Sequence, residues 1–140
     1  MENPMHVAYI TDDKYAMPTL VSIISMRKNK NIDDVYYVHI LCDGISPDSK
    51  NKLKSAEAID FYVDIIEMTN TEILDGFEIP NLHVSTSALY KFSIANIFPS
   101  LNKVIYLDGD TLIQKSLRGL YDIDISEYYA AVVRPKADDI

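Results

Sequence analysis

Short apolar runs rich in β-branched and aromatic residues alternate along the chain with segments of helical spacing. The predicted strands are residues 7–11, 35–42, 59–68, 103–107 and, near the end, 129–133. Parallel strands need a long crossover between them, and that crossover is usually a helix. The alternation therefore predicts an α/β fold, with a mostly parallel sheet flanked by helices.

Three helices are expected between these strands. The first is predicted at residues 17–28, where Pro18 suits the first turn and the apolar positions recur at helical spacing. The second is predicted to follow a cap at Ser46 and to reach about residue 57. The third is predicted from residue 85 or 87 through 97, after a loop at 69–83 that contains at most one helical turn. No repeat, linker or low-complexity tract interrupts the pattern, so residues 1–140 are predicted to form one domain.

Composition narrows the classes of partner. The chain has 140 residues, 48% of them hydrophobic, which suffices for a single packed core. Its formal net charge of −8 disfavours nucleic acid and anionic membrane surfaces, because both attract clustered Lys and Arg. An acidic protein that binds a phosphorylated ligand usually needs a cation between the two. The net charge therefore favours a divalent metal ion between the protein and any phosphorylated ligand.

The single cysteine, Cys42, excludes an internal disulfide and is expected to be a buried core residue in a reducing compartment. The N-terminus has neither a basic start nor an apolar core, and no stretch approaches the ~18 apolar residues of a membrane span. These features predict a soluble, cytoplasmic chain without a transmembrane segment. Peripheral attachment to the inner membrane through a missing C-terminal part is left open.

Two acidic clusters directly follow predicted strands: Asp12 and Asp13 after the first, and Asp108-Gly109-Asp110 after the fourth. Ligands of open α/β sheets bind beyond the carboxyl ends of strands where the strand order reverses. If these two strands are neighbours there, both clusters face one crevice. Alternate residues of an extended segment point the same way, so Asp108 and Asp110 could hold one Mg²⁺ or Mn²⁺, while Gly109 would let a phosphate or ribose approach the backbone. The alternative is an ordinary Asp-Gly turn.

Other chemistry remains open for this cluster. In aspartyl phosphatases and phosphotransferases the first Asp of a strand-D-x-D-x-T segment is the nucleophile, which would be Asp108, although Thr111 falls one place early. A calcium-binding EF-hand is excluded, because Leu112 and Ile113 stand where oxygen ligands and a glycine are needed. A non-catalytic nucleotide-binding or interaction domain is the third alternative.

Three further residues are candidates for ligand binding. Tyr15 could stack on a base and Asp12 could accept a hydrogen bond from a base or ribose, unless they are simply a half-buried tyrosine and a helix-start aspartate. Lys91 could meet a diphosphate, although a solvated surface lysine is the commoner case. The three histidines lack metal-ligand spacing, and His39 is expected to pack or to make a cross-strand hydrogen bond.

Taken together, four segments resemble glycosyltransferase family 8, the retaining GT-A enzymes that include bacterial lipopolysaccharide glucosyl- and galactosyltransferases. They follow the family's order and lie at residues 6–16, 39–46, 87–92 and 103–113. The resemblance implies a Rossmann-like GT-A core in which Asp12 and the backbone around Ile10 hold uracil and ribose and Tyr15 stacks on the base. Lys91 stands where many relatives have an Arg near the phosphates and the donor sugar.

By the same resemblance, Asp108 and Asp110 would bind Mn²⁺, with Asp108 also near the ribose. The implied reaction moves a hexosyl unit from UDP-glucose or UDP-galactose to a carbohydrate acceptor, such as lipopolysaccharide or another surface glycan. The family's third metal ligand is a His in a later segment, but this chain ends 30 residues after Asp110. We therefore expect the N-terminal, donor-binding part of an enzyme, without its acceptor-binding half. No residue present is an evident sugar nucleophile.

Overall fold

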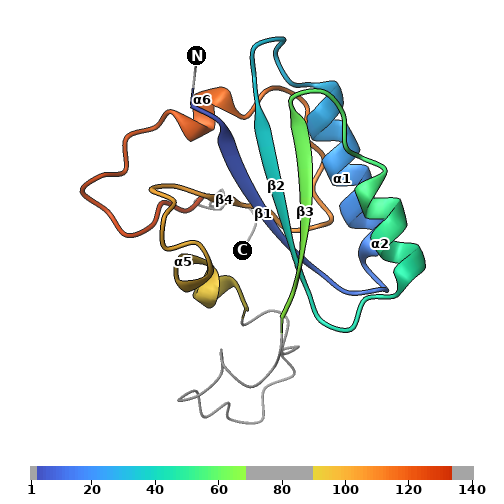
Figure 1. Cartoon of the computed structure of the whole chain (residues 1–140). Coiled ribbons are helices and arrows are strands. Elements are labelled where there is room, and N and C mark those ends of the chain that lie inside the picture. Colours follow the sequence, from blue (N-terminus) through green and yellow to red (C-terminus); the bar gives the residue numbers. More distant parts are fainter. Residues whose placement is uncertain (1–2, 69–89, 134–140) are drawn as a thin grey trace, which may run out of the picture.

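The computed structural model describes residues 3–68 and 90–133, which form an alternating α/β arrangement (Figure 1). In chain order the elements are β1 (Met5–Thr11), α1 (Ala16–Lys28), β2 (Tyr36–Cys42), α2 (Pro47–Lys54), β3 (Phe61–Glu67), the 3₁₀ helix η1 (Tyr90–Ser93), α5 (Ile94–Ile97), β4 (Ile105–Tyr106) and α6 (Arg118–Tyr121). The α/β fold predicted from the sequence pattern is confirmed.

All four strands are parallel and lie in the order β3-β2-β1-β4. β1 pairs with β2 along its whole length, and on its other side it pairs with β4 through Val7↔Ile105 and Ala8↔Tyr106. The chain thus builds outward from β1 to β3 and then returns to the opposite side of β1. The strand order reverses between β1 and β4, so the first and fourth strands are neighbours, which is the condition for the two acidic clusters to face one crevice.

Helices cover both faces of the sheet, which explains why the central strands are almost wholly apolar. α1 and α2 lie together on one face (Figure 1), where Ile23 and Leu53 join a core with Val7 and Val38. On the other face η1 and α5 pack over Leu41, and Tyr90, Ile94 and Phe98 complete a smaller cluster there. Alternate residues of β1 and β2 therefore enter different clusters, as the two-residue period of a strand requires.

Local signals explain the start of α2. Ser46 has extended backbone and its hydroxyl accepts a hydrogen bond from the Ser49 N–H at 3.3 Å, while Pro47 occupies the first turn. The predicted cap is confirmed, although the helix ends at Lys54, earlier than expected. Of the third predicted helix, residues 85–89 lie outside the described residues, as does the predicted loop 69–83; the described remainder forms η1 and α5.

Two strand predictions need correction. Residues 129–133 form no strand, and Tyr129 and Val132 are almost fully exposed. Their apolar composition is not sufficient, because a strand also needs a neighbour that satisfies its backbone groups. β4 has only two residues instead of the five predicted, although the Leu107 N–H still donates to the Ala8 carbonyl at 3.0 Å. Within the described ranges, none of the helices combines the length and the apolar character that crossing a bilayer requires.

His39 makes the cross-strand hydrogen bond expected of it. Its Nε2 lies 3.0 Å from Nδ1 of His6, and the two rings are nearly parallel. His39 is 9% exposed and packs against Phe98, and among the described residues its Nδ1 has no hydrogen-bond partner. Burial lowers the pKa of both histidines, and for His39 the neighbouring His6 lowers it further, against a smaller upward effect of Asp64. The pair is therefore held neutral.

This pair predicts a loss of stability in mild acid. The pKa of each folded histidine lies below the ordinary value of about 6.5, so the unfolded chain binds protons first as the pH falls. The stabilisation is complete above about pH 6.5 and is lost as the pH falls through the lowered values. Urea unfolding between pH 7 and pH 5 should show a declining free energy of unfolding, with a smaller slope in His39→Phe. Equal slopes in the two proteins would contradict this origin.

Candidate functional site

The carboxyl ends of β1 and β4 lie side by side where the strand order reverses. β1 ends at Thr11 and is followed by Asp12, while β4 is followed by Leu107 and Asp108. Because β1 and β4 are paired and parallel, the segments that follow them leave the sheet at the same end of the strands. The structure thus brings the two predicted acidic segments to one end of one strand pair.

The start of α1 joins these two segments. The Thr19 hydroxyl, fully buried on α1, lies 3.0 Å from the Thr11 hydroxyl at the end of β1. Gly109 packs directly on Thr19, so closely that a Cβ at Gly109 would lie well under 3.0 Å from the Thr19 Oγ1. The end of β1, the beginning of α1 and the loop after β4 are therefore in contact through Thr19.

Asp108, Gly109 and Asp110, here named the acidic turn, do not continue β4 as an extended segment. Gly109 and Asp110 form a turn, and Thr111 donates to the Asp108 carbonyl from its N–H at 3.3 Å and from its hydroxyl at 2.8 Å. The prediction of an extended segment is therefore wrong for this triplet, whose backbone forms the alternative, an Asp-Gly turn. Because the Thr111 hydroxyl satisfies the Asp108 carbonyl locally, the chain can turn as soon as the ladder with β1 ends.

Both carboxylates of the acidic turn are exposed, and one of them has a partner on β4. The Tyr106 hydroxyl donates to Oδ1 of Asp108 at 2.8 Å. Burial of the phenol, its hydrogen bond to Asp108 and the charges of Asp108 and Asp110 together raise the pKa of Tyr106. The Tyr106 phenol therefore keeps its proton and donates it to the Asp108 carboxylate.

The donor set fits a cation that is shared with a ligand. In residues 3–68 and 90–133, no group of three or more His, Cys, Asp or Glu side chains could hold a metal ion. Mg²⁺ commonly binds through one or two carboxylates, with phosphate oxygens and waters completing its shell. The two exposed carboxylates of the acidic turn match that arrangement, and hard oxygen ligands also suit Mn²⁺.

The remaining predicted site residues lie at or near this end of the sheet or on η1. Asp12 is half-buried, and its Oδ1 accepts a hydrogen bond from the Tyr15 N–H at 2.9 Å, so this carboxylate shapes the turn that leads into α1. Tyr15 is 48% exposed and Ile10 packs in the smaller core cluster. Lys91 is an exposed residue of η1. Their roles toward a ligand stay predictions.

Asp13 has a structural contact that sequence reasoning missed. Its Oδ1 accepts hydrogen bonds from the Ser46 N–H at 2.9 Å and the Ser46 hydroxyl at 2.8 Å. These bonds, led by the backbone bond, and a contribution from Ser49 lower the pKa of Asp13. Asp13 thus joins the loop after β1 to the cap of α2, and the only sequence signal was the Ser-Pro cap that it binds.

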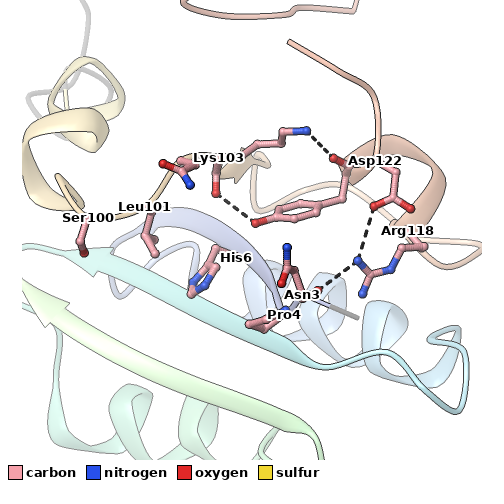
Figure 2. A pocket seen from close by; sticks show the side chains of 10 residues that line it. Asn3, Pro4, His6, Ser100, Leu101, Lys103, Arg118 and Asp122 are labelled. Carbon is pink, nitrogen blue, oxygen red and sulfur yellow. Dashed lines mark hydrogen bonds and ion pairs between the residues drawn. The ribbon is translucent and has the colours of Figure 1, made fainter. Parts of the chain in front are cut away.

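A pocket at the opposite end of β1 is separate from this site (Figure 2). It is formed by the residues that precede β1, the loop before β4 and α6. Both of its cationic side chains have partners. Lys103 Nζ donates to the Tyr121 carbonyl at 2.7 Å, and a guanidinium nitrogen of Arg118 lies 3.5 Å from Oδ1 of Asp122. The residues that line it include none of the predicted site residues.

Comparisons with known proteins agree with the fold. The model of the family described as "Glycosyl transferase family 8" matches residues 6–139. General stress protein A of Bacillus subtilis (strain 168) is 27% identical over 131 residues, which are 92% of this chain and 46% of that protein.

Solved glycosyltransferase structures are also similar to this chain, and LgtC and WbbM are two of them. The galactosyltransferase LgtC, in complex with donor and acceptor sugar analogs, has a TM-score of 0.70 and 26% identity over 86% of this chain and 43% of its own. The bifunctional glycosyltransferase WbbM has a TM-score of 0.72 at 21% identity, over 89% of this chain and 22% of its own. This chain spans less than half the length of each of these three proteins. A family match over nearly the whole chain, on a GT-A fold, shows that this chain belongs to glycosyl transferase family 8.

Proposed function

We propose that this chain is the donor-binding part of a retaining hexosyltransferase that takes a glucosyl or galactosyl unit from its UDP-sugar and transfers it to a carbohydrate acceptor. The observation that carries the proposal is the meeting of the acidic turn with the end of β1 at the point where strand order reverses. Family membership supports glycosyl transfer, and LgtC supports a sugar donor and a sugar acceptor by analogy.

Electrostatics explains why a cation belongs in this proposal. The carboxylates of Asp108 and Asp110 would repel a diphosphate, and the chain has a net charge of −8. A Mn²⁺ or Mg²⁺ held by both would remove that repulsion, and when bound it would supply Lewis-acid stabilisation of the departing UDP. Thr19 fills the space where a side chain of Gly109 would lie, so in this proposal Gly109 offers a phosphate or ribose only its backbone groups.

The other residues have binding roles in this proposal. Asp12 and the backbone at Ile10 would hold the uracil and ribose, and Tyr15, whose ring is half exposed, would stack on the base. Lys91 would place its ammonium near the phosphates and the donor sugar. The acceptor, lipopolysaccharide or another surface glycan, and a cytoplasmic location belong to the same proposal.

The aspartyl phosphotransferase alternative now has less support. It would use Asp108 as a nucleophile, but the family match and the similarity to LgtC both favour glycosyl transfer. A non-catalytic nucleotide-binding domain would share the donor site and would differ only in turnover. Release of UDP from UDP-galactose or UDP-glucose in the presence of Mn²⁺ separates these cases and identifies the donor sugar.

Calorimetry tests the metal bridge. UDP should bind in the presence of Mn²⁺, and the affinity should fall at least about tenfold in Asp110→Asn or when the metal is chelated, because one carboxylate cannot hold the bridging cation as two do. Asp33→Asn is the matched control, since Asp33 is an exposed aspartate in the loop before β2. UDP binding that is indifferent to chelation and to Asp110→Asn would refute the bridge.

A further inference from the structure

The segment after the acidic turn lies along α1 and contacts side chains about one helical turn apart. Thr19 packs on Gly109, the Ser22 hydroxyl lies 3.1 Å from the Thr111 hydroxyl, and the Ser25 hydroxyl accepts from the Ile113 N–H at 2.9 Å. Residues three apart on a helix share a face. We name Thr19, Ser22 and Ser25 the hydroxyl row of α1.

The number of protons fixes the direction of one chain of hydrogen bonds through this row. Each hydroxyl has a single proton to donate. Thr111 donates its proton to the Asp108 carbonyl at 2.8 Å, so at its contact with Ser22 it must accept. Ser22 then has no proton left, and at its 2.9 Å contact with Tyr9 it must accept as well. The bonds therefore run from Tyr9 through Ser22 and Thr111 to Asp108.

This chain of bonds begins in the core and ends at an exposed loop. Tyr9 and Ser22 are fully buried, Thr111 is half-buried and Asp108 is exposed. Burial raises the pKa of Tyr9 to about 12, although its bond with Ser22 lowers it, so the phenol keeps its proton at physiological pH. A buried tyrosine is well held by packing and can anchor the bonds that follow it.

We propose that Ser22 and Thr111 are positioning residues that hold the acidic turn in the conformation that accepts a divalent cation. Neither residue would touch the cation itself. By fixing the Asp108 carbonyl, they limit the freedom of the turn that carries both carboxylates, and a pre-ordered pair of ligands loses less conformational entropy on binding. The inference rests on the proposed function, because it assigns a role toward the cation of the same site.

Mn²⁺ affinity in the presence of UDP, measured by calorimetry at a temperature where circular dichroism shows every variant folded, tests this role. Ser22→Ala and Thr111→Val should each weaken Mn²⁺ binding by about twofold to tenfold, the range expected for one hydrogen bond. Thr111→Ser keeps the hydroxyl and should bind as the wild type does. Ser55→Ala is the control, because within residues 3–68 and 90–133 the Ser55 hydroxyl bonds only locally, to the Lys52 carbonyl on α2.

A purely structural role would lower the melting temperature and leave the Mn²⁺ affinity of the folded protein unchanged. Wild-type affinity in both Ser22→Ala and Thr111→Val, or failure of Thr111→Ser to restore it, would therefore overturn the inference alone. If Ser22→Ala does not fold, the half-buried Thr111 variants decide the question. A wild-type chain that binds UDP without regard to Mn²⁺ would overturn the proposed function and this inference together.

Discussion

Replacing Asp34 with alanine should lower the free energy of unfolding by about 3 kcal/mol, because it removes the buried carboxylate of an ion pair with the partly buried Arg118. The Asp34 carboxylate is 1% exposed and accepts hydrogen bonds from the Ser116 hydroxyl at 2.6 Å, the Asn31 N–H at 2.9 Å and Arg118 Nε at 3.3 Å. It thus connects the loop before β2 with the segment that leads into α6. Without the carboxylate, donors from both segments would lose their acceptor.

Acid should weaken the same connection. Burial alone would raise the pKa of Asp34, but the hydrogen bonds from Ser116, Asn31 and Arg118 and the positive charge of Arg118 outweigh it and hold the pKa below its ordinary value. A lowered carboxyl pKa stabilises the fold above the unfolded value of about 3.9, and the stabilisation is lost as the pH falls through the folded value. This effect lies at lower pH than that of the histidine pair, so the two can be measured separately.

Urea unfolding at pH 7 of Asp34→Ala, with Asp33→Asn as the control, measures the effect. Asp33 is adjacent and exposed, so its variant should change the free energy of unfolding by less than about 0.5 kcal/mol. Asp34→Asn, which keeps the shape and one acceptor oxygen, should fall between the two. A loss below about 1 kcal/mol in Asp34→Ala would show that the ion pair and its hydrogen bonds contribute little net stability.

The sequence predicted the first three strands to within two residues at each end, and the physical reason is their burial. The central strands β1 and β2 are covered by helices on both faces and are mostly apolar, so composition marks them, whereas the edge strand β3 is marked by alternating buried and exposed residues at its start. Residues 103–107 and 129–133 have a similar composition, yet only two of these ten residues are in a strand. Whether such a run forms a strand depends on a neighbouring strand that no local pattern specifies.

The site was predictable to the extent that its chemistry depends on residue type. Carboxylates directly after apolar strands indicated the acidic turn, and a family resemblance added the other candidate residues. The hydroxyl row was not predicted, because Ser22 looks like a neutral residue in an apolar helix until Thr111, 89 positions later, is placed beside it. Likewise, nothing local to Gly109 shows that Thr19 occupies the space of its missing side chain.

Gly109→Ala should therefore have a large effect on the site. A methyl group at this position would lie well under 3.0 Å from the Thr19 Oγ1, a separation that real side chains do not tolerate. Thr19 is fully buried and its hydroxyl is hydrogen-bonded to Thr11, so it cannot rotate away without losing that hydrogen bond. Overpacking of this kind costs about 1 to 3 kcal/mol of stability. If the acidic turn shifts instead, Mn²⁺-dependent UDP binding should weaken at least about tenfold.

The double variant Gly109→Ala, Thr19→Ala identifies the cause. Once Oγ1 is removed, the nearest Thr19 atom is its Cβ at 3.4 Å from the added methyl group, which is ordinary van der Waals contact. Binding lost in Gly109→Ala should then return in part, and the double-mutant cycle should show a coupling energy of about 1 kcal/mol or more. Gly119→Ala is the control, because a methyl group there meets nothing within 4 Å. If the effects of the two substitutions are additive, contact with Thr19 does not explain the loss of binding. The glycine would then be needed for another reason, such as close approach of the ligand.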